Sequence, residues 1–92
     1  MPPTTPATPA PFFTLFTSAQ ALGDAIQARR TAAGLSQVAA AKHCRVGRRC
    51  FIEVENGKAT ARLDKVLAVM TGMGLLAIVV PFEVAQAALR PA

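Results

Sequence analysis

Residues 34–58 of this chain read GLSQVAAAKHCRVGRRCFIEVENGK, a segment with the start and stop signals of two short helices. Ser36 can cap the first helix, which we expect to run to about Cys44, because its hydroxyl accepts a hydrogen bond from a free N–H of the first turn. The second helix is predicted from about Gly47 to Glu55, where an Asn-Gly pair tolerates positive φ and ends it. Two short helices joined by a tight turn are therefore expected.

A further helix is predicted on each side of this pair. Thr17 begins a capping box at the start of the preceding helix, and Gly34 is placed to end it. Thr60 can cap the following helix, which is expected to end at Gly72 or Gly74. In both helices apolar residues recur at helical spacing, namely Leu22, Ile26, Ala33, Leu63, Val66, Leu67, Met70 and Met73.

The run from residue 75 to 80 is short, apolar and partly β-branched, and Gly74 and Pro81 bound it. Such a run is typical of a strand that is buried on both faces. Because no second strand is predicted in the domain, the simplest hydrogen-bonding partner is the same strand of a second copy of the chain. The alternative is that the run extends the preceding helix. The residues expected in the dimer interface are Leu75, Leu76, Ile78, Val79 and Val80.

Positive charge is concentrated in the central helices. The 92 residues include 10 Lys and Arg against 5 Asp and Glu, a formal charge of +5, and most of the basic residues lie between Arg29 and Arg62. Only Glu53 and Glu55 oppose them there. Such a cationic face over short helices is typical of a helix-turn-helix that binds DNA in the major groove. An anionic membrane surface, or a face that is merely solvated, is the alternative.

Size and composition disfavour several classes of protein. A chain of 92 residues has room for one small domain and not for an elaborate enzyme. The first residues lack the positive charge of a secretory signal, and the uncharged run over 66–82 is shorter than the roughly 20 residues of a membrane span. We therefore expect a cytoplasmic, nucleoid-associated protein.

His43, Cys44 and Cys50 are the side chains that raise the question of a metal site or a nucleophile. A structural zinc site needs a full set of ligands, usually with closely spaced cysteine pairs, and this spacing does not provide it. We expect Cys44 and Cys50 to be small buried side chains. No metal, no cofactor and no catalytic residue is predicted, and the protein is not expected to be an enzyme.

Several spaced elements match one family pattern: Leu22-Gly23, Arg30, Gly34-Leu35-Ser36-Gln37, Val46, Arg48-Arg49 and the run from Glu53 to Lys58. Together they resemble the helix-turn-helix of the phage Cro and C1 repressor family, also called XRE. Within that family, residues 55–60 and 72–76 are most similar to HipB-type antitoxins, which are partners of serine/threonine kinase toxins. The resemblance covers roughly residues 13–82.

The resemblance implies a mainly α, lambda-repressor-like domain of four to five helices, with one C-terminal β-strand that pairs across a homodimer. It implies a sequence-specific DNA-binding antitoxin that represses its own toxin-antitoxin operon at a palindromic operator. Such a protein also binds and neutralises a HipA-like kinase toxin. The alternatives are a stand-alone repressor of the Cro/C1 type with no toxin partner, and a toxin-binding or scaffolding module whose basic face is incidental.

On this basis the chain divides into four segments. Residues 1–16 are expected to be a proline-rich flexible tail, or alternatively a polyproline ligand for another protein. Residues 17–74 are the helix-turn-helix DNA-binding domain, 75–82 the dimerisation strand and 83–92 a C-terminal tail, either a short Ala-rich helix or loose. Four apolar residues are expected to pack against the domain or a second subunit, namely Phe12, Phe13, Leu15 and Phe16.

The DNA contacts are expected around the second short helix. Arg48 and Arg49 are best placed to reach base edges, where Arg binds guanine O6 and N7. Gln37, at the start of the first short helix, is expected to position a phosphate. Ile52 either contacts a thymine methyl group, packs on a neighbour or is merely exposed. The remaining expected contacts are Gly47 at the helix start and the phosphate-binding residues Lys42, Arg45 and Lys58.

Arg30 and Glu55 match the structural ion pair of the family. This pair connects the second short helix to the helix that precedes the two short ones. Their role is expected to be scaffolding. The chain also departs from the family pattern, because Ala39 and Ala40 replace an acidic residue and a leucine. Arg45 and Gly47 stand where the family usually has a turn glycine and a capping Ser or Thr. The turn before the second short helix, which is the recognition helix of a helix-turn-helix, is therefore expected to be unusual.

Overall fold

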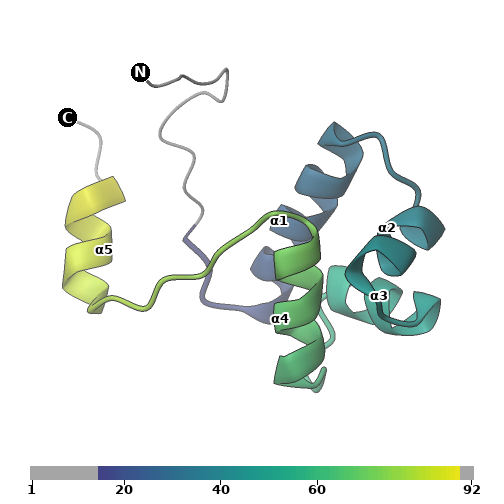
Figure 1. The fold of residues 1–92 in the computed structure, drawn as a ribbon. Helices are drawn as coiled ribbons and strands as arrows, with labels where there is room; N and C mark the ends of the chain where they lie inside the picture. Colours follow the sequence, from purple (N-terminus) through teal and green to yellow (C-terminus); the bar gives the residue numbers. More distant parts are fainter. Residues whose placement is uncertain (1–14, 90–92) are drawn as a thin grey trace.

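A computed structural model of the chain describes residues 15–89. These residues form five α-helices: α1 (Ala19–Ala32), α2 (Gln37–Cys44), α3 (Arg48–Glu55), α4 (Leu63–Gly72) and α5 (Phe82–Leu89). Helices α1 to α4 pack together, with α2 and α3 lying side by side, while α5 lies apart from them (Figure 1). The predicted mainly helical, helix-turn-helix fold is confirmed.

Two predicted helix starts are wrong. Helix α1 is capped by Ser18, whose hydroxyl accepts a hydrogen bond from Ala21 N–H at 3.1 Å, and not by Thr17. Ser and Thr offer the same acceptor, so the sequence does not distinguish adjacent capping residues. Helix α4 begins after Arg62, which makes no side-chain cap, and not after Thr60. Residue 60 lies instead in a turn.

The core lies between α1, α3 and α4. Ile26, Phe51 and Val69, one from each of these helices, are fully buried. Ala40 and Ala41 of α2 are buried beside them, because their small side chains let the helices approach closely. A Cβ on Gly23 would collide with the Glu55 backbone, and one on Gly72 with Cys44, so contacts through glycine set the spacing of the helices.

Helices α1, α3 and α4 each end next to a glycine of positive φ. The Gly74 N–H donates to Thr71 O at 3.0 Å and the Leu75 N–H donates to Met70 O at 2.8 Å, with Gly74 at φ 77°. This is the Schellman arrangement, in which a residue of positive φ reverses the chain. It stops α4 and excludes the alternative that residues 75–80 extend this helix. Gly34 and Gly57 have positive φ at the ends of α1 and α3.

Helix α2 ends in the left-handed region without a glycine. Arg45 has φ 59° and ψ 41°. Within residues 15–89 it is the only residue other than glycine that has positive φ. Backbone hydrogen bonds hold it there, because the Val46 N–H donates to Ala41 O at 3.1 Å. The turn that the sequence marked as unusual therefore places Arg45 in the left-handed region, at a cost of about 1 kcal/mol for an L-residue.

No strand forms within residues 15–89. Residues 75–81 are an irregular connection, and most of their apolar side chains are exposed, with Leu76 at 85% and Val79 at 98%. The predicted strand is thus not formed in the single chain, which offers it no partner. Leu15 and Phe16 are exposed rather than packed on the domain. Phe12 and Phe13 lie outside the described residues.

We predict that Arg45→Gly raises the free energy of unfolding by about 0.5–1 kcal/mol, because glycine adopts positive φ without the Cβ penalty. Urea denaturation at equilibrium measures the change. Gly34→Ala is the matched control, since Gly34 also has positive φ and has open space around its Cβ position. It should lower stability by about 1 kcal/mol. Equal stability of Arg45→Gly and the wild type would contradict the strain at this turn.

Candidate DNA-binding interface

Helix α3 has a buried face and a cationic face. Phe51, Val54 and Glu55 are buried, whereas Arg48 and Arg49 at its start are exposed. The Arg49 side chain is 93% exposed. Gly47 is the N-cap with φ −67° and ψ 152°, and it provides no side-chain hydrogen bond. The start of α3 therefore presents free backbone N–H groups and two guanidinium groups to solvent.

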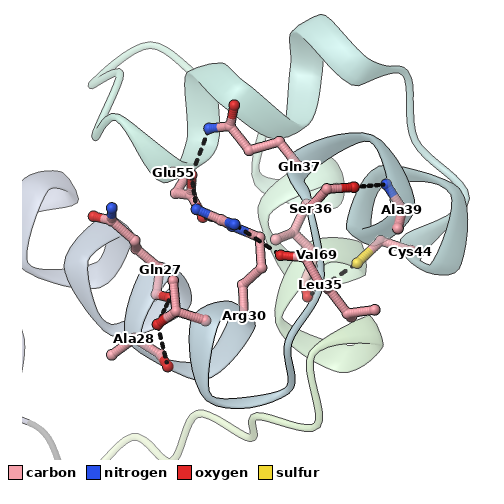
Figure 2. A network of polar contacts seen from close by, with 11 residues as sticks. Gln27, Ala28, Arg30, Leu35, Ser36, Gln37, Ala39, Cys44, Glu55 and Val69 are labelled. Carbon is pink, nitrogen blue, oxygen red and sulfur yellow. Dashed lines mark hydrogen bonds and ion pairs between the residues drawn. The ribbon is translucent and has the colours of Figure 1, made fainter.

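A buried polar network fixes α3 against α1 and α2 (Figure 2). Arg30 Nε of α1 lies 2.6 Å from Glu55 Oε2, and the Arg30 guanidinium also donates to Leu35 O at 2.8 Å. Glu55 is 4% exposed, so its charge depends on this ion pair in place of water. The network determines the direction in which the exposed face of α3 points.

Gln37 belongs to this network. Its Nε2 donates to Glu55 Oε1 at 2.7 Å, and Figure 2 shows its side chain directed toward Glu55. The sequence suggested that this amide would contact a phosphate, but in the structure it helps to satisfy the buried carboxylate. Ser36 caps α2 by accepting from Ala39 N–H at 3.1 Å.

The other predicted contact residues surround α3. Lys42, Arg45 and Lys58 are exposed, and Ile52 is partly buried. Glu53 lies between two of the basic residues: its Oε2 is 3.5 Å from Arg49 Nε and 3.3 Å from Lys58 Nζ. The sequence showed Glu53 only as an opposing charge, because it does not reveal which cations a surface carboxylate touches.

Sequence reasoning missed the role of Arg29. Its Nε donates to Met73 O at 2.9 Å and so satisfies a carbonyl at the end of α4. The sequence grouped Arg29 with the basic residues of the DNA-binding face. A basic residue in the last turn of α1 gave no indication of a contact 44 residues away in sequence.

The cysteines differ in burial. Cys44 is buried and its Sγ donates to Val69 O at 3.6 Å, whereas Cys50 is only partly buried, contrary to prediction. Burial raises the pKa of the Cys44 thiol, which disfavours the thiolate that a nucleophile or a metal ligand requires. Within residues 15–89, no three His, Cys, Asp or Glu side chains gather as a metal site would require.

Two comparisons place this geometry among known proteins. A family model described as a helix-turn-helix domain matches residues 21–79, so the chain belongs to the helix-turn-helix domain family. Its fold is similar to that of HipB, in the structure of a HipB variant in complex with an O2 20mer. The TM-score is 0.70 at 18% identity, over 77% of this chain and 99% of that chain. No curated protein matches the sequence.

The predicted helix-turn-helix family is thus confirmed, and the resemblance to HipB is confirmed for the fold. Among the helices that the structure describes, none is both long and apolar enough to cross a membrane.

We predict that Glu55→Ala lowers the free energy of unfolding by about 3 kcal/mol, because Arg30 and Gln37 are left without their partner. Urea denaturation measures the loss. Asp64→Ala is the control, since it removes an exposed carboxylate 2.8 Å from Arg62 and should cost less than about 1 kcal/mol. A loss no larger than that of the control would contradict the scaffolding role. DNA sequence preference should be unchanged in the folded fraction.

Proposed function

We propose that the protein is a sequence-specific DNA-binding antitoxin that represses its own toxin-antitoxin operon and neutralises a HipA-like serine/threonine kinase toxin. The observation that carries the DNA-binding part is the pair of exposed arginines, Arg48 and Arg49, at the start of the recognition helix of a helix-turn-helix domain. Arginine at this position reaches base edges in the major groove. A cytoplasmic, nucleoid-associated location follows from this function.

The basic side chains have separate roles in the proposed complex. Arg48 and Arg49 read bases, while Lys42, Arg45 and Lys58 bind phosphates and position the domain. The backbone N–H groups at the start of α2 add a phosphate contact, although the Gln37 side chain is directed toward Glu55. Ile52 lies one turn after Arg48. Its apolar side chain contacts a thymine methyl group, which is the apolar feature of the major groove.

The segment after α4 supports a homodimer. Its side chains at Leu76, Ile78 and Val79 are more than two-thirds exposed, and within the described residues its backbone from 76 to 80 is not paired with another segment. Pairing of residues 75–80 with the same segment of a second copy buries these side chains and satisfies the backbone. The dimer presents two copies of α3 about 34 Å apart, one turn of DNA.

The antitoxin part rests on the similarity to HipB in sequence pattern and fold. HipB has been solved in complex with an O2 20mer, and its fold is shared over 77% of this chain. HipB-type antitoxins are partners of serine/threonine kinase toxins. By this similarity, the partner of the present protein is a kinase, and complex formation both neutralises the kinase and keeps the repressor at its operon.

We predict that selection from a random duplex library yields a palindrome with half-sites about 10 base pairs apart, as a two-fold dimer requires. Arg48→Ala and Arg49→Ala should each weaken binding to that duplex by about 10-fold or more, with a smaller effect on shuffled DNA. Lys42→Ala is the control and should weaken binding to both duplexes equally. Full preference retained by the arginine double variant would overturn the assignment of specificity to these residues.

We predict that a tagged copy, purified from its native cell in moderate salt with nuclease added, brings down a kinase-like protein in near-stoichiometric amount. Mass spectrometry identifies the partner, and its kinase activity should fall when the purified antitoxin is added back. Recovery of the protein alone would contradict the antitoxin role and leave a stand-alone repressor. A tagged Glu55→Ala variant controls for capture that does not depend on the folded domain.

A further inference from the structure

Glu53 connects two cations of the proposed DNA-binding surface. Its Oε2 lies 3.5 Å from Nε of Arg49, one turn earlier in α3, and 3.3 Å from Nζ of Lys58, just after the helix. The backbone supports the second contact, because the Lys58 N–H donates to Glu53 O at 3.0 Å. The turn that ends α3 thus fixes Lys58 beside the same residue that holds Arg49.

This cluster of Arg49, Glu53 and Lys58 contributes little to folding. The side chains of Arg49, Lys58 and Glu53 are 93%, 47% and 34% exposed, and ion pairs open to water add little to stability. Its effect on DNA is larger, because phosphates are bound by the same cations and are repelled by a carboxylate. Glu53 therefore lowers the affinity of the surface for any DNA backbone.

We infer that Glu53 is a specificity-determining residue, which withholds Arg49 and Lys58 from the phosphates of unrelated DNA and orients Arg49 toward a base edge. This inference rests on the proposed function, DNA binding through α3. On unrelated DNA, affinity comes almost entirely from phosphate contacts, so competition by Glu53 is fully expressed.

On the operator sequence, Arg49 can bind a base edge as well as a phosphate. It approaches Glu53 through Nε, which leaves both terminal amino groups for the O6 and N7 of a guanine. The planar guanidinium also loses little conformational freedom for each hydrogen bond that it forms with the base. Glu53 thus weakens binding to unrelated DNA more than binding to the operator, and the ratio of the two affinities rises.

The test compares Glu53→Gln with the wild-type chain on two labelled duplexes, the sequence selected by the wild type and a shuffled version of it. Fluorescence anisotropy over a series of salt concentrations gives both affinities and their salt dependence. We expect Glu53→Gln to bind the shuffled duplex about fivefold more tightly, with a steeper salt dependence from newly engaged phosphates. Affinity for the selected duplex should change less, so the specificity ratio falls about threefold or more.

Asp64→Asn is the matched control, because it removes one negative charge from another exposed ion pair, with Arg62. It should leave the specificity ratio unchanged. If Glu53→Gln raises both affinities by the same factor, Glu53 acts only through net charge and the inference is overturned. If the wild type selects no sequence, the proposed function fails, and the inference with it. Thermal melting confirms that both variants are folded.

Discussion

The buried carboxylate of Glu55 is the constraint on which the arrangement of α1, α2 and α3 depends. It is 4% exposed and receives hydrogen bonds from Arg30 of α1 and Gln37 of α2. A buried charge without partners costs several kcal/mol, on the order of 3–5, so these helices must keep their positions to satisfy it. The backbone packing supports the same arrangement, because Gly23 has no side chain and lets α1 approach the end of α3 at the Glu55 carbonyl.

This constraint also determines what α3 presents to solvent. With Phe51, Val54 and Glu55 turned inward, the residues on the other side are Arg48, Arg49 and Glu53. The polar network is internal and the cationic face is external, so they use different residues of the same two-turn helix. Substitutions on the exposed face can therefore change its charge and shape while the scaffold is retained.

The helices and the core were predictable from the sequence because they depend on local signals. Glycines end α1, α3 and α4, and apolar spacing identified Ile26, Met70 and Met73 as core residues, although Leu63 and Leu67 of the same spacing are exposed. Contacts between distant residues were not predictable: nothing local in the sequence indicates that Arg29 reaches Met73 or that the Gln37 amide turns toward Glu55. The predicted strand at residues 75–80 needs a second chain, so a single chain leaves it untested.

Glu53 and Glu55 show how position on one helix determines the function of a carboxylate. They are two residues apart, which places them on different sides of α3. Glu55 points into a buried site, where its ion pair with Arg30 and its hydrogen bond from Gln37 serve the fold. Glu53 is partly buried and lies beside two exposed cations, so water and salt weaken its ion pairs and a phosphate can compete for its cations. Its contacts are therefore exchangeable, and exchange with DNA is what a contribution to specificity requires.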